Sequence, residues 1–290
     1  MDVLFRTYRE SDYPAVCDFL VELNREDKSH VNWNWARFEW MIEHPEFDRD
    51  AAGSIGLWCD GERVVGTAIY DMYFGEAFCA ALLEYAAIYP DILDYAYQEL
   101  KDDAGLGISI CDGNTAEIEK AKRAGFVLAE QKETVMSMEL DGELSAPLPD
   151  GLTLKELHHE KDAETLQWLF WQGFDHGCDR EEFEKSDKGV SHLRMHFRKE
   201  LSLGAMTPDG EGAAYCCLWF LDGTDYAYVE PVCTIPAYRG RGAAKALLYE
   251  ALNRARALGA KRAYVISDQV FYEKLGFRKD RTFSFYWKKQ

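Results

Sequence analysis

The chain of 290 residues is long enough for two domains. Hydrophobic residues make up 47% of it and aromatic residues 14%, which is ample for packed cores. Its formal net charge of −18, from 51 Asp and Glu against 33 Lys and Arg, argues against a nucleic-acid partner, which needs a basic face. The sequence begins without a basic, apolar leader and contains no apolar stretch of membrane-spanning length, so we expect a cytoplasmic protein without a membrane partner.

The eight cysteines are scattered, without a Cys-x-x-Cys pair or a histidine spacing that would form a tetrahedral metal site. We therefore predict no metal. The acidic excess suits a cationic substrate such as an amine if it surrounds a cleft, and the alternative is that it serves solubility alone.

Along the first half, residues 3–8 are typical of a strand, and an amphipathic helix carrying Val16, Phe19, Leu20 and Leu23 follows. Residues 54–59 and 63–70 are typical of a hairpin, because Asp-Gly separates two apolar runs. The second half repeats this order, with a strand at 152–157, a helix, and a hairpin of 203–206 and 213–220.

Two short matches make the repeat explicit. Residues 84–90 parallel 230–236, each with a glutamate six residues before a proline, and residues 121–126 parallel 272–277. The copies are offset by 146 residues at the first match (230 against 84) and 151 at the second (272 against 121). A period near half the chain predicts two copies of one α/β domain, with boundaries at 1–140 and 152–290 and a Pro/Gly-rich linker at 141–151.

Residues 229–248 combine a strand, a loop with two glycines and two arginines, and a helix with an i, i+3, i+4 apolar stripe. Glycines let the backbone approach a ligand, and a helix N-terminus offers unpaired N–H groups, so the pattern predicts a phosphate cradle. The third glycine of a dinucleotide fingerprint and the Gly-Lys-Ser/Thr of a Walker loop are missing. The first copy has no such loop after Pro90.

The run Arg239-Gly240-Arg241-Gly242-Ala243-Ala244 resembles the Gln/Arg-x-x-Gly-x-Gly/Ala motif of the GNAT acetyltransferases, and residues 271–277 are similar to their Tyr-x-x-Leu-Gly-Phe signature. The two motifs stand in the right order. The whole chain therefore resembles a tandem GNAT protein, intact in 151–290 and degenerate in 1–140. This resemblance implies two GNAT-like domains, each a mixed, mostly antiparallel twisted sheet flanked by helices.

The resemblance also implies acetyl-CoA as cosubstrate. The loop amides and Lys245 would hold the pyrophosphate, and the end of the central strand would pair with the pantetheine arm as an added strand does. The implied coenzyme-binding residues are Val232, Cys233, Thr234, Arg239, Gly240, Arg241, Gly242, Ala243, Ala244 and Lys245.

For catalysis, the resemblance implies that Tyr272 protonates the departing thiolate, and the alternative is that it packs on the sheet. The family's usual glutamate falls on Tyr228, so Glu230, two residues on and on the same strand face, is the candidate base. Because Glu84 matches it in the copy without the loop, Glu230 could equally be structural. The asparagine that often precedes the tyrosine by seven residues is Val265 here, with Ser267 and Asp268 the nearest polar residues.

Aromatic-rich helices at 32–44 and 168–179 stand where the family builds its acceptor pocket, although helical aromatics usually belong to a core. Aromatics with carboxylates suit a cationic amine. The candidate substrate-binding residues are Trp171, Asp175, His176 and Tyr228.

The sequence thus predicts an N-acetyltransferase that moves an acetyl group directly to a primary amine of a small, cationic molecule. One alternative is a non-catalytic acyl-CoA-binding or sensing protein. Another places the acceptor site in the cleft between the two copies. A homo-oligomer is a further possibility.

Overall fold

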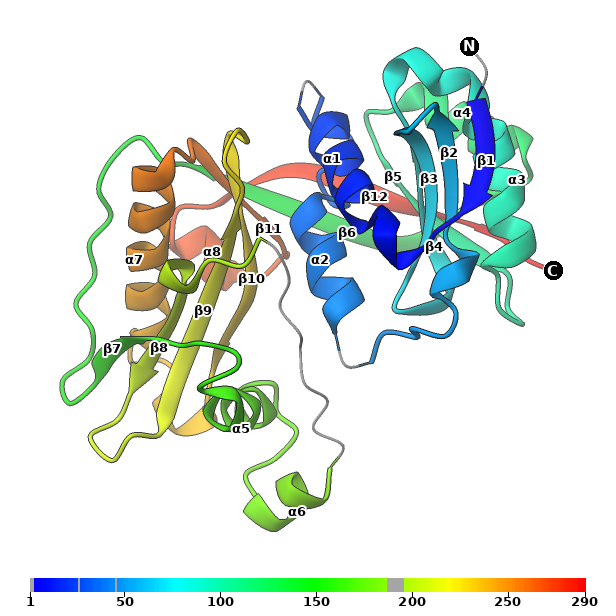
Figure 1. Cartoon of the computed structure of the whole chain (residues 1–290). Coiled ribbons are helices and arrows are strands. Elements are labelled where there is room, and N and C mark those ends of the chain that lie inside the picture. The colour runs from blue at the N-terminus through cyan, green and yellow to red at the C-terminus, as the bar shows by residue number, and fades with distance from the viewer. Residues whose placement is uncertain (1–2, 26, 45, 187–195) are drawn as a thin grey trace.

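The computed structural model describes residues 3–25, 27–44, 46–186 and 196–290. They form two lobes, one from each half of the chain, and two long strands run from one lobe to the other (Figure 1). Within these residues, one sheet of twelve strands passes through both lobes, in the order β1-β2-β3-β4-β5-β12-β6-β11-β10-β9-β8-β7. None of the described helices is both long and apolar enough to cross a bilayer.

The described residues of the first half form six strands and four α-helices, joined in places by short 3₁₀ turns. The elements are β1 (Val3–Thr7), η1 (Glu10–Asp12), α1 (Tyr13–Leu23), α2 (Trp35–Glu43), η2 (Ala52–Ser54), β2 (Gly56–Asp60), β3 (Arg63–Asp71), β4 (Tyr73–Ala81), η3 (Leu83–Ile88), α3 (Tyr89–Glu99), β5 (Leu106–Cys111), α4 (Thr115–Arg123) and β6 (Val127–Glu139).

The second half repeats this order from residue 153, and no described helix or strand lies between Glu139 and Thr153. Its elements are β7 (Thr153–Glu156), α5 (Ala163–Gly173), α6 (Arg180–Lys185), η4 (Lys199–Leu201), β8 (Ser202–Met206), β9 (Gly212–Phe220), β10 (Tyr226–Thr234), η5 (Pro236–Tyr238), α7 (Ala243–Leu258), β11 (Arg262–Ile266), α8 (Val270–Lys274) and β12 (Arg278–Lys288).

The predicted fold class is confirmed: the sheet is mixed, mostly antiparallel and flanked by helices, with parallel pairing at β4–β5 and β10–β11. The exchange of the two last strands was not predicted. Strand β6 of the first half pairs with β11, strand β12 of the second half pairs with β5, and β6 and β12 pair with each other. Each half therefore completes its sheet with a strand from the other.

Side chains from both halves share one of the three apolar cores. The core of the first half extends to Trp219, Tyr226, Tyr228 and Tyr264 of the second. A second core lies between α7 and the sheet, and a third lies under α5. The stripe predicted for α7 is confirmed, because Leu247, Leu248, Ala251, Leu252 and Ala255 are all fully buried.

The sequence match between Glu84 and Glu230 is wrong as a structural equivalence. Strand β4 ends at Ala81, and Glu84 lies in the η3 turn, exposed and paired with Arg63 at 2.9 Å. Glu230 lies inside β10. Glu84 therefore does not hold in the first half the place that Glu230 has in the second.

Replacing Phe283 tests the strand exchange. This β12 residue is 1% exposed and belongs to the core of the first half. We expect Phe283→Ala to lower the free energy of unfolding by about 3–5 kcal/mol, the usual cost of emptying a buried aromatic site. Urea unfolding should remain one transition, because both halves share the strand. Val127→Ala, at an exposed β6 position, is the control and should cost less than about 1 kcal/mol. Two separate transitions would contradict the shared sheet.

Candidate coenzyme and acyl-transfer site

The two parallel strands β10 and β11 diverge part of the way along their length. Residues 226–228 of β10 pair with residues 262–264 of β11. Beyond that point, residues 229–234 of β10 have no partner in β11 within the described chain. Over that stretch β10 remains bonded to β9 on its other edge. The divergence leaves a wedge, lined by a strand edge whose N–H and C=O groups are open to an extended ligand.

A β-bulge lies at the base of the wedge. Val229 pairs with Leu218 and Val232 with Cys216, so Glu230 and Pro231 together face a single residue of β9. A bulge bends its strand and turns the side chains that follow it. The indole N–H of Trp219 donates to the backbone oxygen of Glu230 at 2.8 Å and holds this bend.

The three residues predicted to face pantetheine lie at the open end of β10. Val232 and Thr234 are half-buried. The thiol of Cys233 is turned toward α5, where a Cβ added at Gly173 would lie 2.7 Å from its sulfur. At Cys233 only the backbone is therefore directed to the wedge edge.

Next to the wedge, the glycine loop opens helix α7. Gly240 and Gly242 have φ of +73° and +95°, the left-handed region that favours glycine, and a Cβ at either would meet open space. Gly242 is the N-cap of a 16-residue helix. Among the described residues, the amides from Gly240 to Lys245 have no hydrogen-bond acceptor, whereas the amide of Ala246 bonds the Gly242 oxygen at 3.0 Å. These open donors at a helix N-terminus fit a phosphate group.

The basic side chains of the loop have different surroundings. Arg239 donates to the backbone oxygens of Thr234 and Gly173, both at 3.0 Å, and to Asp175 Oδ1 at 2.8 Å. It therefore braces the loop against the end of α5. Two cations that hold no carboxylate among the described residues remain beside the cradle: Arg241 lies over the Tyr238 ring and Lys245 over the Tyr249 ring.

Glu230 and Tyr272 interact electrostatically. Burial raises the pKa of the Glu230 carboxyl to about 7, against the opposing effects of the Arg37 guanidinium and a hydrogen bond with Tyr228. Burial also raises the pKa of the Tyr272 hydroxyl, and the Glu230 charge adds to that rise. Tyr272 lies in α8 and is 8% exposed. The arrangement pairs a carboxyl that titrates near neutrality with a phenol that keeps its proton.

The four predicted substrate-binding residues fall in two places. Trp171 and His176 lie at the end of α5 with ring centroids 5.3 Å apart, and Asp175 pairs with Arg239 of the glycine loop. Tyr228 is fully buried, in the core shared with the first half. Asp175 therefore contacts the glycine loop, with Trp171 and His176 next to it at the end of α5, and Tyr228 lies two residues before Glu230 in β10.

The polar residues that stand in for the usual asparagine have local roles. The hydroxyl oxygen of Ser267 accepts a hydrogen bond from the Gln269 amide at 3.1 Å, just before α8. In the first half, Asn114 caps α4 by accepting from the Glu117 amide at 3.2 Å. Both side chains order a helix start.

Sequence reasoning missed Arg37, on α2 of the first half. Its guanidinium contacts Asp71 and Glu133 and affects the pKa values of both Tyr228 and Glu230. Nothing in the local sequence singles it out, because its neighbours come from distant strands. Carboxylates from β3 and β6 nevertheless converge on this one arginine.

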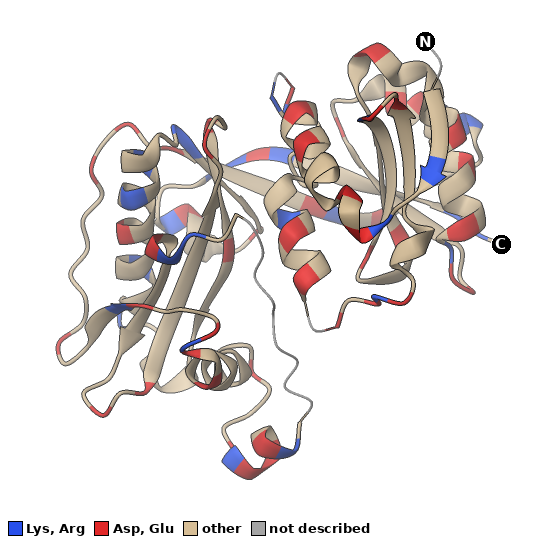
Figure 2. Ribbon diagram, viewed as in Figure 1, with Lys and Arg blue, Asp and Glu red and all other residues tan. Residues whose placement is uncertain are grey.

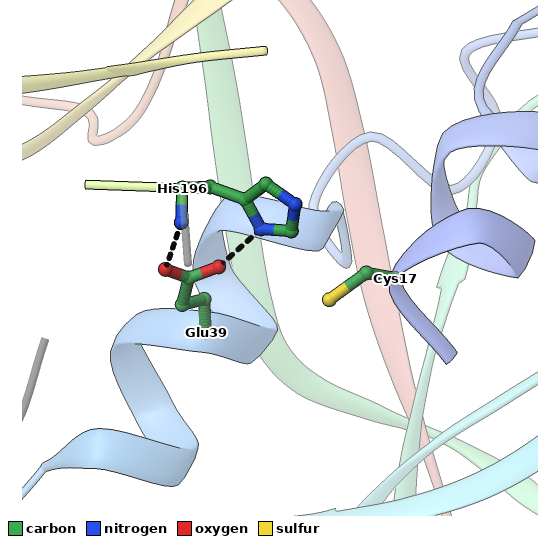
Figure 3. A group of neighbouring side chains, drawn as sticks. All are labelled: Cys17, Glu39 and His196. Atoms are coloured by element: carbon green, nitrogen blue, oxygen red, sulfur yellow. Dashed lines mark hydrogen bonds and ion pairs between the residues drawn. The ribbon is translucent and has the colours of Figure 1, made fainter. Parts of the chain in front are cut away.

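A group of possible metal ligands lies between the halves: atoms of Cys17, Glu39 and His196 lie within 4.8 Å of one another (Figure 3). The buried Glu39 carboxylate already accepts from the Tyr13 hydroxyl and from the His196 amide and ring Nδ1, the last two at 3.1 and 2.7 Å. A metal ion there would have to displace these donors. These bonds join α1 and α2 of the first half to the segment that precedes η4 in the second.

Comparison with known proteins finds a family model that matches part of the chain. The model of the acetyltransferase (GNAT) family matches residues 162–277. No curated protein matches the sequence significantly.

Among solved structures, a GCN5-related N-acetyltransferase from Sphaerobacter thermophilus is 15% identical, with a TM-score of 0.60 over 99% of this chain and 95% of that one. A tandem GNAT protein from the clavulanic acid biosynthesis pathway is 14% identical, with a TM-score of 0.60 over 99% and 98%. Saccharomyces cerevisiae N-myristoyltransferase with bound myristoyl-CoA is 14% identical, with a TM-score of 0.54 over 98% and 77%. Residues 162–277 thus match the model of the GNAT acetyltransferase family, and the fold of the whole chain is similar to that of a tandem GNAT protein.

Proposed function

We propose that the protein transfers an acetyl group from acetyl-CoA to the primary amine of a small, cationic molecule, at the wedge of the second half. The observation that carries this proposal is the placement of Glu230 and Tyr272 together beside a splayed strand and an open phosphate cradle. The fold of the family supports acyl transfer from an acyl-CoA.

The wedge fits the coenzyme through its own open groups. The amides from Gly240 to Lys245 would hold the pyrophosphate, with Arg241 and Lys245 adding charge, and the free edge of β10 would pair with the amides of pantetheine. The acyl thioester is the electrophile that the coenzyme supplies.

Glu230 and Tyr272 have different roles in the proton transfers, one as base and the other as acid. Glu230 takes a proton from the substrate ammonium, and the free amine nitrogen forms a bond to the thioester carbon. As the carbon–sulfur bond breaks, Tyr272 gives its proton to the thiolate and regains one from the nitrogen that has bonded to the acyl carbon, so the products are an amide and free coenzyme A, and Glu230 releases its proton to solvent. A carboxyl with a pKa near 7 is deprotonated often enough at neutral pH to act, yet basic enough to accept.

The sequence-based alternative of a non-catalytic acyl-CoA-binding protein rested on the missing glutamate at position 228 and on the missing asparagine, and it stays an alternative. The match with Glu84 favoured a structural role for Glu230, and that support is lost because Glu84 lies in an exposed turn. Cytoplasmic location and homo-oligomerisation stay predictions.

Coenzyme binding tests the cradle. We expect Arg241→Ala with Lys245→Ala to weaken coenzyme A about tenfold or more, because two charge-assisted contacts to phosphate are removed. Pantetheine, which has no pyrophosphate, should bind as before in calorimetry. Arg239→Ala is the matched comparison: it frees the loop from Thr234, Gly173 and Asp175, and should weaken both ligands. Equal losses for both ligands in the double variant would contradict the cradle.

Thiol release tests the acid. Tyr272→Phe should lower kcat about a hundredfold, in the range of general acid catalysis, and leave the Kd of acetyl-CoA within a factor of about three. The assay follows free thiol with a panel of amines, and Phe271→Leu in the same helix is the control. Coenzyme binding without thiol release for any amine would favour the non-catalytic alternative.

The pH profile tests the base. Since Glu230 must be ionised to accept a proton, kcat/KM should rise with pH through an apparent pKa near 7 and level off above it. In Glu230→Gln this step should disappear and the plateau should fall. An unchanged profile would assign the base to another group.

A further inference from the structure

Trp219 of β9 is bonded to the strand that carries Glu230, at the point where that strand bulges. Its indole N–H donates to the Glu230 backbone oxygen at 2.8 Å. Glu230 and Pro231 together face a single residue of β9, and Pro231 has no N–H to donate. A side chain of β9 thus supplies a bond to β10 where the backbone ladder is interrupted. Because a bulge redirects the side chains of its strand, whatever holds the bulge also sets the direction of the Glu230 side chain.

Aromatic rings from both halves hold Trp219 in turn. Its side chain is buried, at 2% exposed, and belongs to the core of the first half. The Trp35 ring of α2 meets it edge-on, with ring centroids 6.4 Å apart and an interplanar angle of 75°. Phe197 of the second half meets it in the same way, at 6.5 Å and 71°. The indole cannot turn away from Glu230 without displacing these neighbours.

The contact that α2 makes with this region has a second point of attachment. Trp35 is fully buried and also meets the His196 ring edge-on, at 5.4 Å and 72°. The amide and the ring Nδ1 of His196 bond the Glu39 carboxylate at 3.1 and 2.7 Å (Figure 3). Trp35 and Glu39 are four residues apart on one helix, so they share a face of α2. That face therefore fixes the segment that supplies Phe197 as well as the indole of Trp219.

We propose that Trp219 is a positioning residue for Glu230, and that the first half keeps Trp219 in place through Trp35. The inference rests on the proposed function, in which Glu230 is the base. It gives a role in acyl transfer to the half without a glycine loop, because α2 of that half supports the bulge from which the Glu230 carboxyl projects. The indole is bonded to the backbone of Glu230, so it acts through that residue and not on the substrate.

Loosening the bulge has an effect of known sign. Burial raises the pKa of the Glu230 carboxyl, so a carboxyl that is freer to reach water has a lower pKa. The step in kcat/KM therefore moves to lower pH, and the plateau above it falls because the base is no longer held at its distance from the substrate. The titratable and charged groups that act on Glu230 are Tyr228, Cys217, Tyr272 and Arg37, and the test replaces none of them. A loss of packing alone would lower stability without moving the step.

The experiment measures kcat/KM against pH for three tryptophan-to-phenylalanine variants. Trp219→Phe removes the bond to Glu230 but keeps an aromatic ring, so the step should move down by about one pH unit and the plateau should fall about tenfold. Trp35→Phe should move the step in the same direction by a smaller amount. Trp33→Phe is the matched control, because Trp33 is 1% exposed, its indole N–H has no partner in the described chain, and it stacks on Phe78 of β4 at 3.8 Å. It should leave the profile unchanged.

Urea unfolding of the same variants measures the packing that each one loses. An unmoved step in Trp219→Phe, or equal shifts in Trp219→Phe and Trp33→Phe, would overturn the inference. If Trp219→Phe does not fold, the comparison of Trp35→Phe with Trp33→Phe decides.

A second arm needs no turnover. It titrates Glu230 by NMR of protein labelled with ¹³C at the glutamate carboxyl, with the signal assigned by its loss in Glu230→Gln. The same downward shift is expected in Trp219→Phe. The expected shift in a protein that releases no thiol would refute the proposed function and keep the role of Trp219. Turnover with an unshifted titration in Trp219→Phe would keep the proposed function and overturn the inference.

Discussion

The divergence of β10 from β11 is the constraint on which the rest of the structure depends. A parallel pair that separates after Tyr228 leaves backbone groups open at the centre of a sheet, which is costly unless a ligand or water bonds them. The bulge at Glu230 and Pro231, the indole bond to the Glu230 oxygen and the glycine loop all lie along this opening. The same opening places Glu230 where burial brings its pKa near neutrality.

The exchanged strands place the first half against that opening. Because β6 pairs with both β11 and β12, its residues lie beside the wedge although they belong to the first half in sequence. Glu133 comes from this strand and contacts Arg37 of α2. The half that has no glycine loop of its own thus supplies the strand that lies next to β11. Acidic residues are spread over both lobes, as Figure 2 shows. Two of them, Asp71 and Glu133, contact the half-buried Arg37.

Local patterns in the sequence were enough to predict the repeat, the hairpins, the α7 stripe and the loop conformation, because each depends on neighbours within a few residues. The exchange of β6 and β12 could not be predicted, since either partner satisfies the same alternating pattern. Glu84 was matched to Glu230 by spacing alone, although β4 ends before it. Arg37 and the brace from Arg239 to Asp175 depend on contacts between segments far apart in the chain. The sequence motif at Arg239 indicated a positive charge but did not indicate the direction of the side chain.

The most direct test of this account is amide hydrogen exchange with and without acetyl-CoA, measured by mass spectrometry. The account predicts slower exchange on coenzyme binding across residues 232–246, where β10 has a free edge and α7 has open amides. The corresponding segment of the first half, residues 78–91, should exchange as before, because it passes from β4 through η3 into a helix that carries Pro90 and Asp91 in its first turn. Protection of 78–91, or none at 232–246, would contradict it.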